Sequence, residues 1–236
     1  MGQSFFIWKG TDCRSKGIIM RSPAAIIRPE ERVRHVEIPG RSGDLTETEG
    51  ENIFNSYIQT AEIAVRGWNN VREAYRWLRG AGYVTFSGEP DRRQAARVIG
   101  AITLNRHSKN LDCWEGEVQF YCQPLKEKLQ GGSITVAPDG GVLNSGDVTE
   151  RPDFSFTATD TSATVSAGGN TLVMTGLTEG NAYLIRSDVE MVLTADRQTD
   201  LTANSSGDFP VLEPGANTVA GSGWAAITVW RRERFL

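Results

Sequence analysis

The sequence is short of the residues that most often build metal and catalytic centres. It contains only two histidines, His35 and His107, and three cysteines, Cys13, Cys113 and Cys122. Two histidines exclude a histidine-rich metal site, and no Cys-x-x-Cys pair occurs. Cys113 and Cys122 lie nine residues apart in one expected strand, so they face opposite sides. A disulfide framework is therefore not expected. We expect the protein to be synthesised in a reducing cytoplasm.

Further absences narrow the classes of protein. Gly40-Arg41-Ser42-Gly43 has the wrong spacing for a nucleophile elbow, and neither a P-loop nor a dinucleotide fingerprint is present. Carboxylate pairs such as Glu47 and Glu49 have no aromatic cleft around them, so solvated charge is favoured over glycoside hydrolysis. No run of about 18 apolar residues occurs, and MGQSFFIWKG does not resemble a secretion signal. We expect no catalytic residue, metal, cofactor or membrane partner.

The residues that are present have an ordinary globular composition with an uneven charge. The chain has 236 residues, which is enough for one large or two small domains. Of these residues, 39% are hydrophobic and 23% are charged, as is usual for globular proteins. Residues 1–130 carry 19 Lys and Arg against 16 Asp and Glu, whereas residues 131–236 carry 6 against 13. Beyond Gln130 the composition also shifts to Thr, Ser, Gly, Asp and Asn. We predict two domains, 1–130 and 131–236, neither basic enough for a dedicated DNA-binding protein.

Hydrophobic periodicity predicts a mainly β protein. Apolar residues alternate in 57–65 and 113–122, which is typical of half-buried strands. An apolar stripe at helical spacing predicts the one clear helix over 70–79, with Asn70 as its N-cap. Residues 125–132 break the pattern of the long strand. The first domain is predicted to be β-sandwich-like with one α-helix.

The second domain shows short apolar runs separated by turn signals. We expect strands over 133–136, 153–157, 171–175, 183–186, 189–194 and 225–230. Regularly spaced short strands without a long helix predict an all-β sandwich.

The stretch 28–54, RPEERVRHVEIPGRSGDLTETEGENIF, is the most unusual part of the chain. Residues 33–38 alternate as a strand, Pro39-Gly40 and Ser42-Gly43-Asp44 form turns, and a polar run follows over 45–52. A compact domain rarely keeps so long a polar excursion unless it binds something. The alternative is a solvated hairpin with a loose tip.

The same stretch resembles the distal tail proteins of long-tailed, non-contractile phages. The resemblance continues through FFIWKG at 5–10, FSGEP at 86–90, VQFYCQP at 118–124 and GDFP at 207–210, so it covers nearly the whole chain. It implies a homohexameric ring built by the first domain and a galectin-like sandwich as an attachment platform. The implied partners are the tail tube protein, a tail-associated fibre or lysin protein, and the tape-measure protein. DNA would pass through the lumen without specific binding, and the protein would lie at the virion tail tip after synthesis in the bacterial host cytoplasm.

Because the densest motif lies in this charged stretch, we place the subunit interface there. The candidate interface residues are Arg28, Glu30, Arg41, Asp44, Glu47 and Glu49. Charged pairs at such a joint would set register and exclude wrong partners.

Three other functions stay open. The first is a carbohydrate-binding adhesin that acts through the second domain. True galectins use a histidine in their sugar site, and residues 131–236 contain none, so that site cannot be carried over. Trp224, Trp230 and Tyr183 have rings that can stack on a sugar, but packing is the favoured interpretation. The second is a tail-tube protein that stacks many rings, and an enzyme is the most remote.

Overall fold

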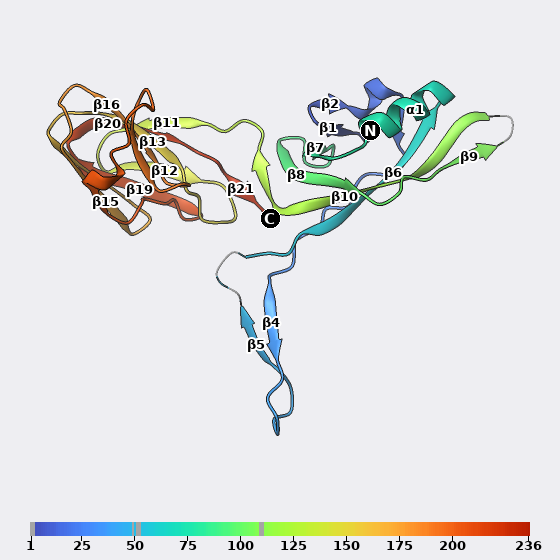
Figure 1. The fold of residues 1–236 in the computed structure, drawn as a ribbon, viewed down its shortest axis with the longest axis horizontal. Coiled ribbons are helices and arrows are strands. Elements are labelled where there is room, and N and C mark those ends of the chain that lie inside the picture. The colour runs from blue at the N-terminus through green and yellow to red at the C-terminus, as the bar shows by residue number, and fades with distance from the viewer. Residues whose placement is uncertain (1–2, 49, 51–52, 109–110) are drawn as a thin grey trace. The chain divides into compact units, whose positions relative to one another are not determined.

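The structure is a computed structural model and describes residues 3–48, 50, 53–108 and 111–236. The chain divides into two compact units, Met1–Leu129 together with Leu236, and Gln130–Phe235. Figure 1 labels the helix and many of the strands of the two units. Strands dominate both, and α1 (Trp68–Trp77) is the only α-helix in the described part of the chain. The predicted mainly β class with one helix is confirmed.

The main body of the first unit is one antiparallel sheet with α1 packed on it. Its strand order is β2-β1-β7-β8-β10-β6-β3, and β9 also pairs with β10. The strands are β1 (Phe6–Trp8), β2 (Thr11–Asp12), β3 (Ile18–Met20), β6 (Tyr57–Arg66), β7 (Ala81–Phe86), β8 (Arg92–Ile99), β9 (Leu104–Ser108) and β10 (Leu111–Lys128), with a 3-10 turn η1 (Cys13–Lys16). Phe6 and Trp8 from β1 lie against Phe120 of β10, with ring centroids 5.5 Å and 5.4 Å apart. These rings and the buried side of α1 form the core.

Helix α1 begins two residues earlier than predicted, and Asn70 does not cap it. Gly67 is the N-cap residue, with φ of 89°, and it has no side chain that could accept a hydrogen bond from the N–H groups of the first turn. That positive φ lets the chain turn directly from β6 into the helix. A residue with a Cβ would be strained in this backbone conformation. Asn70 instead lies in the first turn, where its Nδ2 donates to the Arg66 carbonyl at 2.7 Å.

Strand β10 also runs further than predicted, because it continues to Lys128, into the segment 125–132 where a break was expected. It pairs with β8 on both sides of a register shift between Cys122 and Lys126. Pro124 lies inside this shift. Because proline has no N–H to give to a ladder, a bulge at this place lets the strand continue.

The second unit is a β-sandwich. One sheet has the order β11-β20-β13-β16-β17 and the other β12-β19-β14-β15-β18. The first sheet consists of β11 (Ser133–Val136), β13 (Asp153–Ala158), β16 (Ala182–Arg186), β17 (Met191–Thr194) and β20 (Trp224–Trp230). The second consists of β12 (Gly140–Asn144), β14 (Ser162–Ala167), β15 (Asn170–Thr175), β18 (Ser205–Gly207) and β19 (Gly215–Ser222). A 3-10 turn, η2 (Thr202–Asn204), and β21 (Arg234–Phe235) complete the elements.

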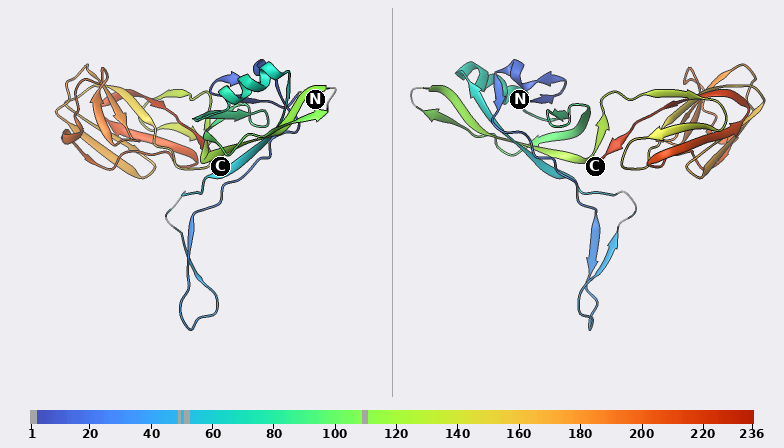
Figure 2. Two further views of the ribbon diagram at one scale, coloured as in Figure 1. Left: turned by 45° about the vertical axis from the view of Figure 1, so that its right-hand side comes forward. Right: turned by 180° about the vertical axis from the view of Figure 1, so that it is seen from behind.

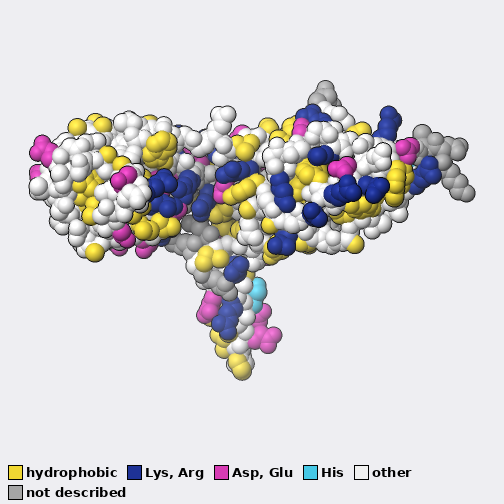
Figure 3. All heavy atoms as spheres, turned by 45° about the horizontal axis from the view of Figure 1, so that its top comes forward, with side chains coloured by type: hydrophobic (Ala, Val, Ile, Leu, Met, Phe, Trp, Pro, Cys, Tyr) yellow, Lys and Arg dark blue, Asp and Glu magenta, His cyan; other side chains and the backbone are white. Residues whose placement is uncertain are grey.

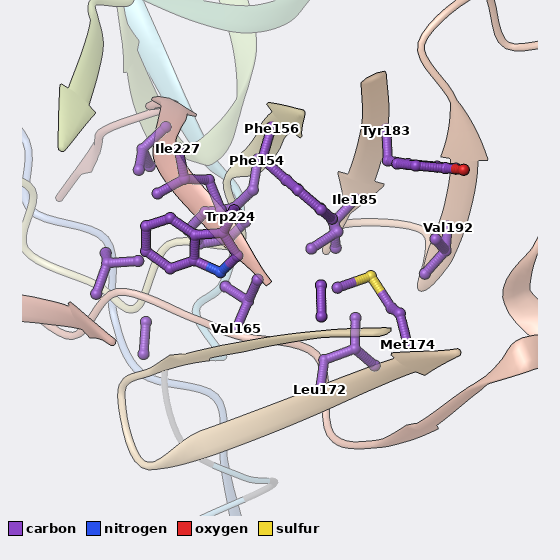
Figure 4. Packing of buried hydrophobic residues seen from close by; sticks show 14 of the residues in the cluster. Phe154, Phe156, Val165, Leu172, Met174, Tyr183, Ile185, Val192, Trp224 and Ile227 are labelled. Carbon is purple, nitrogen blue, oxygen red and sulfur yellow. The ribbon is translucent and has the colours of Figure 1, made fainter. Parts of the chain in front are cut away.

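Buried side chains from both sheets form one core. Phe154 and Ile227 come from the first sheet, and Val165 and Leu172 from the second; all four are fully buried. Figure 4 shows Trp224 among them, near the middle of the cluster. The sandwich predicted for this domain is present, and its galectin-like character stays a prediction.

Candidate functional site

The charged stretch folds as a two-stranded hairpin that belongs to no other sheet. Strands β4 (Val33–Val36) and β5 (Leu45–Thr48) pair antiparallel, with Val33 opposite Thr48 and Val36 opposite Leu45. Figure 2 shows the pair from two further sides as a separate ribbon. Residues 45–48 of the polar run expected over 45–52 form this second strand. Its threonines, Thr46 and Thr48, favour extended backbone, so the alternation of Thr and Glu was the signal for a strand.

A short ladder closes the base of the hairpin. Glu31 and Phe54 form a bridge, the Arg32 N–H donates to the Ile53 carbonyl at 2.9 Å, and the Asn55 N–H donates to Glu30 at 2.8 Å. Phe54 is 7% exposed. The two ends of the hairpin are therefore held together, and the root is anchored by one buried ring.

Most side chains of the hairpin face solvent in the single chain. Arg28, Glu30, Arg41, Asp44 and Glu47 are all exposed, and none of these five forms an ion pair with another described residue. Glu49 lies outside the described residues. Figure 3 shows side chains of both charges and a histidine along the hairpin. The charges of these five residues are thus available to a partner.

Apolar side chains are exposed on the same hairpin and beside its root. Ile38 is 39% exposed and Leu45 37%, while Ile53 at the base is 38% and Ile26 before it 73% exposed. A narrow hairpin has no inner layer in which to bury them. Protein interfaces typically have an apolar centre and a polar rim. The apolar groups beside the unpaired charges of the hairpin match this composition.

Buried polar groups in the first unit hold the sheet together. Lys126 is 5% exposed, and its Nζ donates to Glu89 at 2.6 Å, while Arg92 lies 3.1 Å from the same carboxylate. Burial raises the pKa of the Cys122 thiol to about 12, which keeps it protonated and unreactive. The adjoining cavity measures about 20 Å³, room for about one water. This cluster has no space for a substrate.

The described residues contain no group of three or more His, Cys, Asp or Glu placed to hold a metal ion. Cys13, Cys113 and Cys122 are all free thiols. Nor does any helix in this part of the chain have the length and hydrophobicity needed to cross a membrane.

The three aromatic candidates in the second unit differ in exposure. Trp224 is 3% exposed and its Nε1–H donates to the Thr164 carbonyl at 2.8 Å. Tyr183 is also 3% exposed, and its hydroxyl accepts from the Thr178 N–H at 2.8 Å. Trp230 is 50% exposed. Packing therefore accounts for two of the three, and only Trp230 can meet a ligand.

One buried carboxyl in the second unit makes a pH-dependent contribution to the free energy of unfolding. Glu150 is 2% exposed, accepts a hydrogen bond from the Arg232 N–H, and has a second oxygen without a hydrogen-bond partner among the described residues. Burial, helped by the neighbouring Glu233, raises the pKa of Glu150 to about 7, against the opposing effects of the Arg232 N–H, Arg231 and Arg234. Because the folded-state pKa lies above the ordinary value of 4.5, the folded state holds this proton more tightly than the unfolded state.

Glu150→Gln is therefore expected to stabilise the second unit at pH 8. Between pH 4.5 and 7 the unfolded carboxyl loses its proton first, so the contribution of Glu150 to stability falls as the pH rises and is least favourable above pH 7. The loss amounts to about 3 kcal/mol for a shift of this size. Urea unfolding at pH 4.5 and pH 8 measures it: the variant should gain only at pH 8. Glu179→Gln, at an exposed glutamate, is the control, and a loss of stability in Glu150→Gln at pH 8 contradicts the assignment.

Comparison with known proteins rests on structure. No protein-family model matches the chain, and no curated protein matches it in sequence. The crystal structure of SPP1 Dit (gp 19.1), described as a paradigm of the hub adsorption apparatus in phages that infect Gram-positive bacteria, matches with a TM-score of 0.80 at 18% identity, over 100% of both chains. The phage P2 baseplate in its activated conformation with Ca matches at a TM-score of 0.47 and 8% identity, over 99% of both chains, too low to support an argument. The resemblance predicted from the sequence is thus confirmed for the fold: this chain has the fold of the SPP1 Dit protein.

Proposed function

We propose that the protein is a structural hub of a phage or prophage tail tip, and not an enzyme. The observation that supports this most is the TM-score of 0.80 with SPP1 Dit over the whole of both chains. Likeness across both units, at only 18% identity, favours retention of the complete architecture. The cavity beside Lys126 is water-sized, and the polar groups around it hold the sheet together.

In this proposal six copies form a closed ring through the first predicted domain, residues 1–130. A ring needs a heterologous interface, in which each subunit offers two different surfaces. The hairpin is our candidate for one of them, with Arg28, Glu30, Arg41, Asp44, Glu47 and Glu49 in the joint. Its exposed apolar residues and the unpaired charges among these residues support the assignment. The second surface is assigned to no residues.

The remaining partners follow from the same proposal. The ring would join the tail tube protein on one side to a tail-associated fibre or lysin protein on the other, with the tape-measure protein as a further contact. The second predicted domain, residues 131–236, would point outward as an attachment platform. DNA would pass through the lumen unbound, since residues 1–130 carry nearly balanced charge and phosphate binding grows with each phosphate that is neutralised.

Size-exclusion chromatography with light scattering, followed by negative-stain imaging, tests the ring. We expect a hexamer in solution or, where the isolated protein stays monomeric, six copies around the tip of assembled tails. A tail whose tip lacks the protein, labelled by an antibody against residues 131–236, would refute the proposed location.

The adhesin interpretation keeps one observation in its favour, which is the half-exposed ring of Trp230. That observation concerns the second unit alone, and a hub can also bind a saccharide.

A further inference from the structure

A hollow on the outer face of the sandwich has the features of a ligand site. It measures about 340 Å³, and its lining includes Asp153, Leu184, Arg197, Trp230 and Arg232, all in the second unit. It lies over the first sheet of that unit, where neighbouring strands bring together residues that are far apart in the sequence. This volume is in the range of sites for small ligands.

The strand register places the central residues. Asp153 of β13 is directly opposite Trp230 of β20 and, on its other side, opposite Arg186 of β16. Directly paired residues point to the same face of a sheet. The adjacent Phe154 is fully buried in the core, so Asp153 and Trp230 belong to the outer face.

Trp230 presents a fixed aromatic surface there. Its ring is 50% exposed, and its Nε1–H donates to Ser155 Oγ at 3.2 Å. That hydrogen bond holds the indole in one orientation. An oriented and half-exposed indole can stack against the C–H face of a sugar ring.

Asp153 supplies a hydrogen-bond acceptor. The residue is 8% exposed, and its Oδ2 accepts from Arg232 Nη2 at 2.8 Å. Its Oδ1 has no hydrogen-bond partner among the described residues, and Arg186 Nε is 3.9 Å away. A buried acceptor left without a donor is costly, so a hydroxyl donor from a ligand in the hollow would satisfy it.

Arg197 supplies a positive charge that forms no ion pair with an acid among the described residues. Arg232 is bound to Asp153 and Asp188, and Arg186 lies near the same two acids. Arg197 is exposed and forms no ion pair with a described residue. A free guanidinium favours a ligand with a phosphate or carboxylate group.

From this arrangement we propose that the hollow binds a saccharide unit that carries an anionic group, either a phosphate or a carboxylate. The sugar ring stacks on Trp230, a hydroxyl donates to Asp153 Oδ1, and the anionic group pairs with Arg197. One stacked ring and two polar contacts correspond to an affinity on the order of millimolar, well below that of a dedicated lectin. The site uses no histidine, differs from the galectin constellation, and does not depend on the hub proposal.

Titrations of the full chain, followed by ligand-observed NMR, test the proposal. The probes are glucose 6-phosphate, glucuronic acid, glucose and inorganic phosphate. We expect saturable binding of the first, the second or both, which identifies the phosphate or the carboxylate as the anionic group. Glucose and inorganic phosphate should each bind at least about tenfold more weakly, because each lacks one part of the recognition.

Two variants and two controls connect binding to the hollow. Trp230→Ala and Arg197→Gln should each weaken binding by about tenfold or more. Trp68→Ala, at a tryptophan that is 55% exposed in the first unit, and Arg72→Gln, at an exposed arginine of α1, should leave binding unchanged. Circular dichroism confirms that all four variants are folded.

The proposal is overturned by any of four results. The first is that neither charged sugar binds saturably at concentrations up to about 10 mM. The second and third are that glucose or inorganic phosphate binds as tightly as the charged sugars. The fourth is that binding is undiminished in both Trp230→Ala and Arg197→Gln.

Discussion

Arg41→Glu is expected to convert a hexamer of this protein into folded monomers. Arg41 is exposed in the single chain and pairs with no acid among the described residues, so its loss leaves the isolated fold intact. In the proposed joint it faces a carboxylate of the neighbouring subunit. Reversing its charge there would cost about 2–5 kcal/mol in each joint, and a ring repeats that cost at every joint.

A hairpin-shortened variant gives an independent test of the same joint. Val33 and Thr48 are direct partners, so an Asn-Gly turn between them can replace residues 34–47 and still close a two-residue hairpin. Light scattering and circular dichroism on the same samples give the mass and the fold. Arg72→Glu, on the exposed side of α1, is the control for charge reversal. A hexamer that persists in both hairpin variants shows that the joint lies elsewhere.

Trp224→Ala is expected to lower the free energy of unfolding of the second unit by about 3–5 kcal/mol. The indole is 3% exposed within the core of the sandwich, so its removal leaves a cavity. It also leaves the Thr164 carbonyl without the indole donor that now lies 2.8 Å away. Urea unfolding followed by circular dichroism measures the loss.

Trp230→Ala is the matched control, since it removes the same side chain from a position that is 50% exposed. Substitutions at exposed positions usually change stability by less than about 1 kcal/mol. Equal losses in the two variants would contradict the burial of Trp224.

The sequence predicted the strands whose two faces differ in polarity. Residues 57–65 alternate between buried positions such as Ile63 and polar ones such as Glu62, and they form β6 as expected. Strands β12, β14 and β19 were missed because their sequences, GGVLN, SATVSA and GANTVAGS, are rich in small residues. Small side chains give little contrast between the two faces, and the glycines suggest turns.

The hollow beside Trp230 could not be predicted for a different reason. Asp153 and Trp230 are 77 positions apart and become neighbours only through the pairing of β13 with β20. Arg197 comes from the segment after β17. Nothing in local sequence encodes this pairing, because it depends on which strands of the sandwich are adjacent. The charged hairpin, in contrast, is continuous in sequence, so its unusual composition is visible in the sequence alone.

The strand order of the sandwich has a consequence for biosynthesis. The earliest strands of the second unit, β11 and β12, pair with two of its latest, β20 and β19. During translation β11 and β12 therefore remain without these partners until residues 215–230 have left the ribosome, whereas the first unit has all its strands up to β10 by residue 128. Pairings between residues distant in sequence form slowly, and unpaired strand edges can associate with other chains. Nascent chains stalled before β19 would thus carry the strands of the first unit up to β10 and an open, aggregation-prone second unit.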